Sequence, residues 1–170
     1  MGKAMPAGVI RNWTLFVDRD SKIGQADEMK LPKLERKVDE VFNAGMIAPI
    51  DVQLGYEKPE MEFSFTGYDP DTLKLFGLKV GDEREFMATA APTDDDGEVH
   101  SLVAYLRGYL KMVETDDLKR GDISATKYEL CWRYIRITHD DKDLIEMDPF
   151  FVKIGGVDQT AAERRALLLG

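Results

Sequence analysis

Alternating apolar and polar residues mark two neighbouring strands between positions 50 and 66. In the first strand, apolar positions Val52, Leu54 and Tyr56 alternate with Asp51, Gln53 and Gly55. A turn follows at Glu57-Lys58-Pro59. In the second strand, apolar positions Met61, Phe63 and Phe65 alternate with Glu60, Glu62, Ser64 and Thr66. A period of two indicates a strand with one packed and one solvent-exposed face. We therefore predict a β-hairpin over residues 50–66, whose exposed face is acidic and carries neither Lys nor Arg.

Similar runs of β-branched, aromatic and aliphatic residues predict most of the remaining chain to be extended. The predicted strands cover residues 12–18, 29–38, 84–91, 102–113, 126–138 and 143–147. In the strand over 126–138, one face is expected to hold Tyr128, Leu130, Trp132 and Tyr134. Turn-forming residues separate these runs, so the pattern predicts a single, mainly β domain.

One short helix is predicted at residues 69–76. Asp69-Pro70-Asp71 supplies an acidic N-cap, a proline at the first helical position and an acid near the positive end of the helix dipole. Gly77 is the expected C-cap. Leu73 and Phe76 lie three positions apart, so they are expected to share a face that covers an open end of the sheet. A second helical segment is expected over residues 161–169.

The composition describes a soluble protein of one domain, residues 1–170. The charge of 23 basic and 32 acidic residues gives a net charge of −9. This balance argues against tight binding of nucleic acid, which requires a basic surface, but it is compatible with a wall along which DNA slides. No apolar run reaches the roughly 18 residues that a membrane span requires, so no membrane association is expected.

Candidate catalytic residues are few. Cys131 is the only cysteine, which excludes an internal disulfide and suits a reducing cytoplasm, and its position between Leu130 and Trp132 is typical of a buried strand residue. A nucleophile built from Cys131 with His100 or His139 has no supporting motif. We therefore expect that the protein is not an enzyme and that it binds no cofactor.

Metal-ligating patterns are equally weak. A calcium loop of the EF-hand type could use Asp94, Asp96, Gly97 and Glu98, but it would need another acidic residue at position 92, where the chain has Pro92. A hairpin turn is therefore the better interpretation. Two histidines separated by 39 positions match no zinc motif. No metal site is expected from the sequence.

The segment from Leu31 to Gly55, LPKLERKVDEVFNAGMIAPIDVQLG, is rich in residues that interrupt regular structure. Together with other landmarks in the same order, it resembles the major tail tube proteins of contractile-tailed bacteriophages and phage-tail-like bacteriocins. The landmarks are Asn12 and Leu15-Phe16, Leu31-Pro32-Lys33-Leu34 and Lys37, Gly45-Met46 and Pro49, Val52-Gln53-Leu54-Gly55, Glu62-Phe63, Phe76-Gly77, Leu106-Arg107-Gly108, Glu146-Met147-Asp148, Gly156-Val157-Asp158-Gln159 and Arg164-Arg165.

This resemblance implies a two-sheet β-barrel or sandwich with one short flanking helix and extended inter-subunit loops. It also implies hexameric rings that stack into a hollow tube inside the sheath. The expected partners are other copies of the chain, the tail sheath, the tape-measure protein, and the baseplate and tail-terminator proteins, while DNA passes through without specific binding. The expected location is the tail of a virion or tail-like particle, assembled in the bacterial host cytoplasm. Residues 1–11 and 155–170 are expected to form terminal arms.

Residue roles follow from the same resemblance. The expected inter-subunit arm contains Leu31, Pro32, Leu34, Gly45, Met46 and Pro49, although an irregular loop within one chain is the alternative. The expected lumen-facing residues are Asp51, Gln53, Glu62 and Ser64. Two other functions remain open: the tube of a related contact-dependent secretion system, and a monomeric β-sandwich enzyme or carbohydrate-binding module.

Overall fold

The computed structural model describes residues 7–169, which are mainly β-structure. The strands are β1 (Val9–Val17), β2 (Asp20–Ser21), β3 (Ala26–Lys30), β4 (Arg36–Val41), β5 (Ile50–Tyr56), β6 (Met61–Thr66), β7 (Arg84–Thr93), β8 (Leu102–Thr115), β9 (Ala125–His139), β10 (Lys142–Asp148), β11 (Phe151–Ile154) and β12 (Val157–Asp158). The helices are α1 (Pro70–Lys74), a 3-10 turn over Leu75–Gly77, and α2 (Ala161–Ala166).

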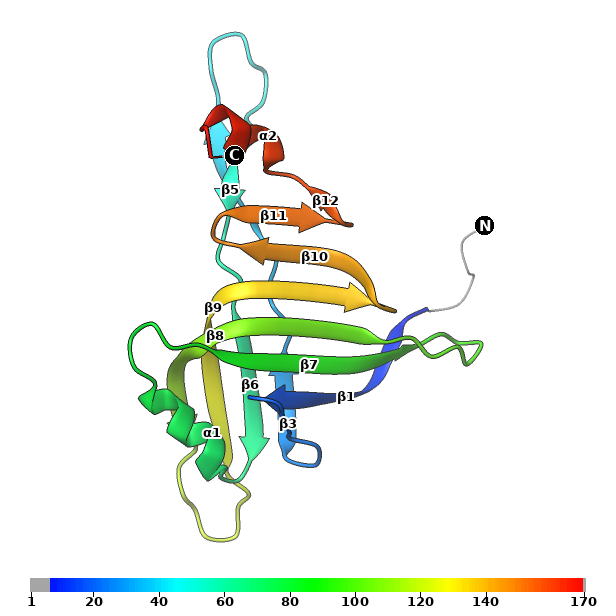
Figure 1. Ribbon diagram of the computed structural model, residues 1–170, viewed down its shortest axis with the longest axis vertical. Coiled ribbons are helices and arrows are strands. Elements are labelled where there is room, and N and C mark those ends of the chain that lie inside the picture. The colour runs from blue at the N-terminus through cyan, green and yellow to red at the C-terminus, as the bar shows by residue number, and fades with distance from the viewer. Residues whose placement is uncertain (1–6, 170) are drawn as a thin grey trace.

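Ten of these strands form one antiparallel sheet. The order β12-β11-β10-β9-β8-β7-β1-β2 makes its main layer, and β6 and β3 are joined to it through β9 (Figure 1). Residues 125–130 of β9 pair with β6, whereas residues 135–139 pair with β10. In Figure 1, β6 and β3 therefore run almost perpendicular to β7, β8 and β10. β9 thus belongs to both layers.

A bulge at Arg133 makes this change of partner possible. Arg107 opposes Tyr134 and the next residue, Gly108, opposes Trp132, so Arg133 has no counterpart on β8. The extra residue reverses the side-chain alternation. The prediction of one apolar face from Tyr128 to Tyr134 is therefore wrong: Tyr128 is buried, whereas Tyr134 lies on the other side of the sheet and its hydroxyl donates to Glu146 Oε1 over 2.8 Å.

The predicted hairpin over residues 50–66 is also wrong in its pairing. β5 pairs with β4, and β6 pairs with β3 and β9. Residues 26–66 instead form one long two-stranded ribbon that is interrupted at residues 31–35 and 57–60, where Pro32 and Pro59 lack ladder donors. Two backbone bonds cross the interruption, Lys33 N–H to Glu60 O over 3.3 Å and Glu57 N–H to Glu35 O over 2.9 Å.

The larger hydrophobic core lies between the β3–β6 half of this ribbon and the main sheet. The predicted inward residues of β6 (Met61, Phe63 and Phe65) are all at most 2% exposed. Phe63 stacks on Tyr128 with ring centroids 5.0 Å apart. The other buried members are Leu15, Val17, Phe86, Ala88, Ala104, Leu106, Leu110 and Leu130. A second, smaller cluster of Ile135, Met147 and Val152 lies beyond the bulge.

The predicted first helix is present, but its buried contacts differ from those expected. Phe76 is 55% exposed, whereas Thr72 is 1% exposed and Leu75 packs against the core. A buried ion pair fixes the start of the helix, because Lys22 Nζ lies 2.9 Å from Asp69 Oδ2 and the Thr72 hydroxyl donates to the same oxygen over 2.5 Å. The helix continues as a 3-10 turn, which rotates Phe76 away from the core.

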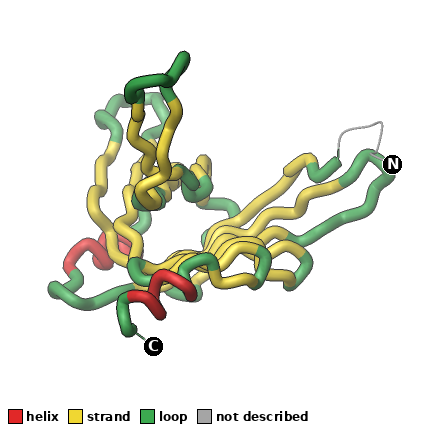
Figure 2. Tube along the Cα trace, turned by 90° about the horizontal axis from the view of Figure 1, so that it is seen from above, coloured by secondary structure: helices red, strands yellow, loops and turns green. Residues whose placement is uncertain are grey.

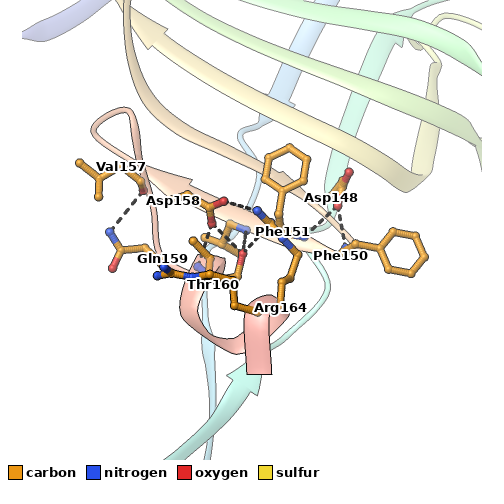
Figure 3. A network of polar contacts seen from close by, with 11 residues as sticks. Asp148, Phe150, Phe151, Val157, Asp158, Gln159, Thr160 and Arg164 are labelled. Carbon is orange, nitrogen blue, oxygen red and sulfur yellow. Dashed lines mark hydrogen bonds and ion pairs between the residues drawn. The ribbon is translucent and has the colours of Figure 1, made fainter. Parts of the chain in front are cut away.

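The C-terminal segment contains more structure than the sequence pattern indicated. Two strands, β11 and β12, follow the strand that was expected to be the last, and α2 closes the chain. Figure 3 shows the network that holds α2: Asp158 Oδ1 accepts the backbone N–H and hydroxyl of Thr160, both over 2.8 Å, and Asp158 Oδ2 accepts Arg164 Nη2 over 2.5 Å. These bonds lower the pKa of Asp158 to about 2, with the Thr160 backbone bond as the largest cause.

The mainly β fold class is therefore confirmed, but the sheet of the single chain is not closed into a barrel. Figure 2 shows the long strands running together toward the N-terminal end, with both helices away from that end. Of the expected N-terminal arm, residues 1–6 lie outside the described part, and residues 9–11 belong to β1. Open sheet edges carry unpaired N–H and C=O groups, and these can be satisfied by other chains.

Candidate assembly surfaces

The hairpin of β4 and β5 extends away from the body of the protein (Figure 1). Its side chains are exposed on both faces along most of its length, as the burial patterns of β4 and β5 show. The exposed apolar residues are Val38, Phe42, Ile47, Ile50, Val52 and Leu54, and Ile47 at the tip is fully exposed. A two-stranded hairpin is marginally stable in water when no further layer covers it.

The tip of this hairpin has a defined turn. Gly45 has a φ of 87°, a left-handed conformation that favours glycine. The Met46 N–H donates to the Asn43 carbonyl over 3.1 Å, and the Asn43 N–H lies 3.2 Å from Met46 Sδ. Gly45 rather than Ala44 is therefore the residue whose backbone requires a glycine.

Two acidic residues oppose each other across the hairpin. Glu40 pairs in register with Asp51, and both side chains are exposed. Like charges directly opposite on neighbouring strands are destabilising. Lower in the hairpin, Arg36 Nη1 donates to Gln53 Oε1 over 2.6 Å. The outer part of the hairpin is therefore both apolar and acidic. Among the described residues, no other part of the same chain covers it.

The residues expected in the inter-subunit arm are divided between the body and the hairpin. Pro32 is buried and Leu31 packs against the larger core. Gly45, Met46 and Pro49 lie in the loop between β4 and β5. Leu34, 46% exposed, lies just before β4. The projecting element therefore begins near Leu34, and it includes β5, which was expected to belong to a separate hairpin.

The four residues expected to face a lumen lie in two different sheets. Asp51 and Gln53 are on β5 in the two-stranded sheet, whereas Glu62 and Ser64 are on the outer face of β6. Residues far apart in the sequence complete the second face, because the register brings Glu28, Lys30, Glu114, Lys127 and Glu129 beside Glu62 and Ser64.

We call these seven side chains the β6 face. Four are glutamates and two are lysines, so the β6 face is net acidic. It is not uniformly negative, because Lys127 Nζ lies 3.5 Å from Glu62 Oε2. Lys30 also lies directly opposite Glu62 in the strand register. The expected acidic face therefore exists in a more mixed form than the pattern of β6 alone indicated.

An apolar groove lies at the base of the hairpin. Its volume is about 190 Å³, and it is lined mainly by Leu34, Tyr56, Ile145, Met147, Val152 and Ile154. The groove joins the hairpin to the smaller core, since Tyr56 and Ile145 pack against the cluster of Ile135, Met147 and Val152. Apolar side chains in an open groove of this kind are typical of surfaces that another protein covers.

The described residues do not assemble the nucleophile that was considered from the sequence. Cys131 and His139 lie eight positions apart on β9, which corresponds to roughly 26 Å at about 3.3 Å per strand residue. His100 lies beside His139, with ring centroids 5.2 Å apart, so it is equally remote from Cys131. No helix among residues 7–169 is long and apolar enough to cross a membrane.

The two histidines form a polar cluster that their spacing in the sequence does not indicate. His100 Nδ1 lies 2.7 Å from Asp140 Oδ2, and His100 Nε2 lies 3.2 Å from Asp94 Oδ2. The hydrogen bonds to Asp140 and then Asp94 raise the pKa of His100 above 6.5. The turn expected at residues 94–98 is confirmed, but Asp94 is 5% exposed rather than solvated.

Comparison with known proteins identifies the family. Residues 7–167 match the family described as phage tail tube protein FII. This chain belongs to the phage tail tube protein family. It is 32% identical over 169 residues to the tail tube protein of Escherichia phage P2, covering 95% of this chain and 97% of that one. It is 28% identical over 139 residues to the major tail tube protein of Serratia phage KSP20, covering 82% and 81%.

A solved structure agrees with this assignment. A chain of the sheath–tube complex of the extracellular contractile injection system PVC, in the extended state, aligns with a TM-score of 0.56 at 8% identity. The alignment covers 81% of this tail tube protein and 93% of that chain, so the two share a fold. The predicted family is confirmed, and with it a structural, non-enzymatic role in the tail of a virion or tail-like particle.

Proposed function

We propose that this tail tube protein forms hexameric rings that stack into a hollow tube, and that the β4–β5 hairpin joins each subunit to its neighbours. The single observation that carries this proposal is the hairpin itself, which exposes apolar side chains on both faces. In a lone subunit this surface and the unpaired edges of the sheet face water. Both are satisfied if a second copy of the chain covers them.

The apolar groove is the receiving surface that fits this hairpin. It lies at the hairpin base and is lined by Ile145, Met147, Val152 and Ile154. Because donor and acceptor surfaces are different patches of one chain, their contact is heterologous and generates rings or continuous stacks. The acidic pair Glu40 and Asp51 on the hairpin is then expected to face the water-filled lumen rather than the groove of the neighbour.

The lumen wall is proposed to be built from the β6 face together with Asp51 and Gln53. These residues lie along one ribbon, because β5 runs into β6 through the interruption at residues 57–60. A net acidic wall repels phosphates and prevents DNA from adhering. The proposal includes enclosure by a sheath and assembly in the host cytoplasm around a tape-measure protein, with baseplate and terminator proteins at the two ends, as the relationship to contractile tails supports.

Electron microscopy of the purified chain tests the role of the hairpin. The wild-type protein is expected to form rings or tubes. A variant with Gly45→Glu and Met46→Arg, or with Ile47→Asp and Val52→Asp, is expected to remain monomeric, because charge is placed on the surface that must be dehydrated.

A matched variant controls for the effect of added charge alone. Val80→Asp introduces the same carboxylate at a fully exposed apolar position outside the hairpin. It is expected to assemble like the wild type, and circular dichroism should show that all variants are folded. Tubes of normal length from both hairpin variants would refute the proposed joint.

A further inference from the structure

The two histidines of the chain, 39 positions apart in sequence, meet at one end of the β8–β9 pair. His139 is the last residue of β9 and opposes Leu102, the first residue of β8. His100 lies two residues before β8, and its backbone N–H donates to the Pro92 carbonyl over 2.8 Å. Asp140 follows His139 directly. The strand register therefore gathers two imidazoles and a carboxylate that the sequence spacing separates.

The possible ligand atoms of these three residues lie close together. Asp140 Oδ2 lies 2.7 Å from His100 Nδ1 and 3.5 Å from His139 Nε2. One ligand atom from each of the three residues can be chosen so that all lie within 4.8 Å of one another. Asp140 is held in place by Ser101, whose N–H donates to Oδ1 over 2.8 Å and whose carbonyl accepts the Asp140 N–H over 2.9 Å.

Asp94 fixes the orientation of the His100 ring from the other side. Its Oδ2 lies 3.2 Å from His100 Nε2, and its Oδ1 accepts the Gly8 N–H over 2.8 Å. Asp94 is 5% exposed, so this carboxylate is part of the interior. Histidines that bind metals usually donate the second ring N–H to a carboxylate, which leaves the first nitrogen with its lone pair free for the ion. Asp94 occupies the position of that supporting carboxylate.

We propose that His100 Nδ1, His139 Nε2 and Asp140 Oδ2 bind a divalent transition metal ion, with Zn²⁺ as the best fit and water as a fourth ligand. Two imidazoles and one carboxylate suit Zn²⁺ and similar divalent transition metal ions rather than Ca²⁺ or Mg²⁺. This site is independent of the proposed tube, because all of its ligands come from one chain.

The distances from Asp140 Oδ2 to the two histidine nitrogens are close to those of tetrahedral coordination. Zn–N and Zn–O bonds of about 2.0–2.2 Å place neighbouring ligand atoms roughly 3.4 Å apart. The 3.5 Å between His139 Nε2 and Asp140 Oδ2 already matches. His100 Nδ1 lies 2.7 Å from the same oxygen, and the two atoms must separate by roughly 0.7 Å. A small rotation of the Asp140 carboxylate about Oδ1 separates them and keeps the hydrogen bond from Ser101. The bound ion would fasten His100, in the segment before β8, to the turn at residues 140–141.

Isothermal titration calorimetry of the full chain, prepared without a histidine tag and freed of metal by a chelator, tests the site with Zn²⁺ alone. One ion per chain is expected to bind, and His139→Gln or His100→Gln should weaken binding by at least about tenfold. Asp94→Asn should weaken it by about 10–100-fold through the ring orientation of His100. Saturating Zn²⁺ should raise the thermal midpoint of the wild type by roughly 5 °C.

Glu98→Gln is the matched control. Glu98 forms a second possible ligand group with Asp94 and His100, so this variant distinguishes the two arrangements. It should bind Zn²⁺ like the wild type. Loss of binding in Glu98→Gln with retention in His139→Gln would overturn the proposed ligand set, as would the absence of binding by the wild type.

A measurement with every proposed ligand in place avoids any dependence on how the ligand variants fold. In NMR spectra of the Ile47→Asp/Val52→Asp variant, which is expected to remain monomeric, the ring signals of both histidines should shift together and stop shifting at one equivalent of Zn²⁺. Added Co²⁺ should give the intense visible absorption of a tetrahedral ion. Histidine signals that stay unchanged at one equivalent of Zn²⁺ would overturn the proposal.

Discussion

The buried ion pair between Lys22 and Asp69 is expected to be one of the main polar contributions to the stability of the subunit. The two side chains are 7% and 10% exposed, and Lys22 Nζ lies 2.9 Å from Asp69 Oδ2. Lys22→Met keeps most of the aliphatic stem and removes the charge. The Asp69 carboxylate then keeps the Thr72 hydroxyl but loses its counter-charge. Breaking one side of a buried pair costs about 3–5 kcal/mol, a large part of the ~5–15 kcal/mol that stabilises a typical domain.

Urea unfolding followed by far-UV circular dichroism measures this loss. The Ile47→Asp/Val52→Asp background is the appropriate host, because assembly would otherwise make the apparent stability depend on protein concentration. Asp69→Asn and the double variant Lys22→Met/Asp69→Asn complete a double-mutant cycle. The double variant should be more stable than the sum of the single losses predicts, because it leaves no unpaired buried charge.

The pH dependence gives a second readout of the same pair. Burial alone would raise the pKa of Asp69, but the hydrogen bond from Thr72 and the charge of Lys22 outweigh it, so this pKa lies below 3.8. The stabilisation is therefore complete above pH 3.8 and is lost as the pH falls through the lower folded-state pKa. The difference between wild type and Lys22→Met should shrink over that acidic range. A loss below about 1 kcal/mol at pH 7, the value of a surface pair, would refute the reasoning.

Three further predictions concern the bulge, the C-terminal helix and the lumen. Gly108→Ala should destabilise the subunit by about 3 kcal/mol or prevent folding, measured by urea unfolding, because its Cβ would lie 1.8 Å from the Cys131 carbonyl oxygen; wild-type stability would contradict this. Asp158→Asn should speed amide hydrogen exchange in α2 at neutral pH. In the wild type, the hydrogen bonds of Asp158 to Thr160 and Arg164 should persist below pH 3.8 and weaken as the pH falls toward the Asp158 pKa of about 2. Asp51→Lys with Glu62→Lys should leave tubes intact but slow genome ejection, and unchanged ejection kinetics would exclude these residues from the lumen.

The sequence by itself determined most of the strands and the buried face of β6, but it missed β11 and β12 and predicted one strand across the interruption at residues 31–35. The inward positions of β6 follow from a period of two, because side-chain direction alternates along a regular strand whatever its partner is. The start of α1 is likewise local, since a proline at the first helical position acts within one turn. The ordered landmarks were also sufficient to recognise the tail tube family.

Only the tertiary structure decided which strands pair and which side chains meet. The alternation of β5 is compatible with pairing to β4 or to β6, and packing of β6 against β9 decides between them. The bulge at Arg133 leaves no periodic signal, because it depends on the close approach of Gly108 on another strand. The meeting of His100 and His139 is set by the register of β8 and β9. Pairing and register are long-range properties, so a pattern read along one segment does not contain them.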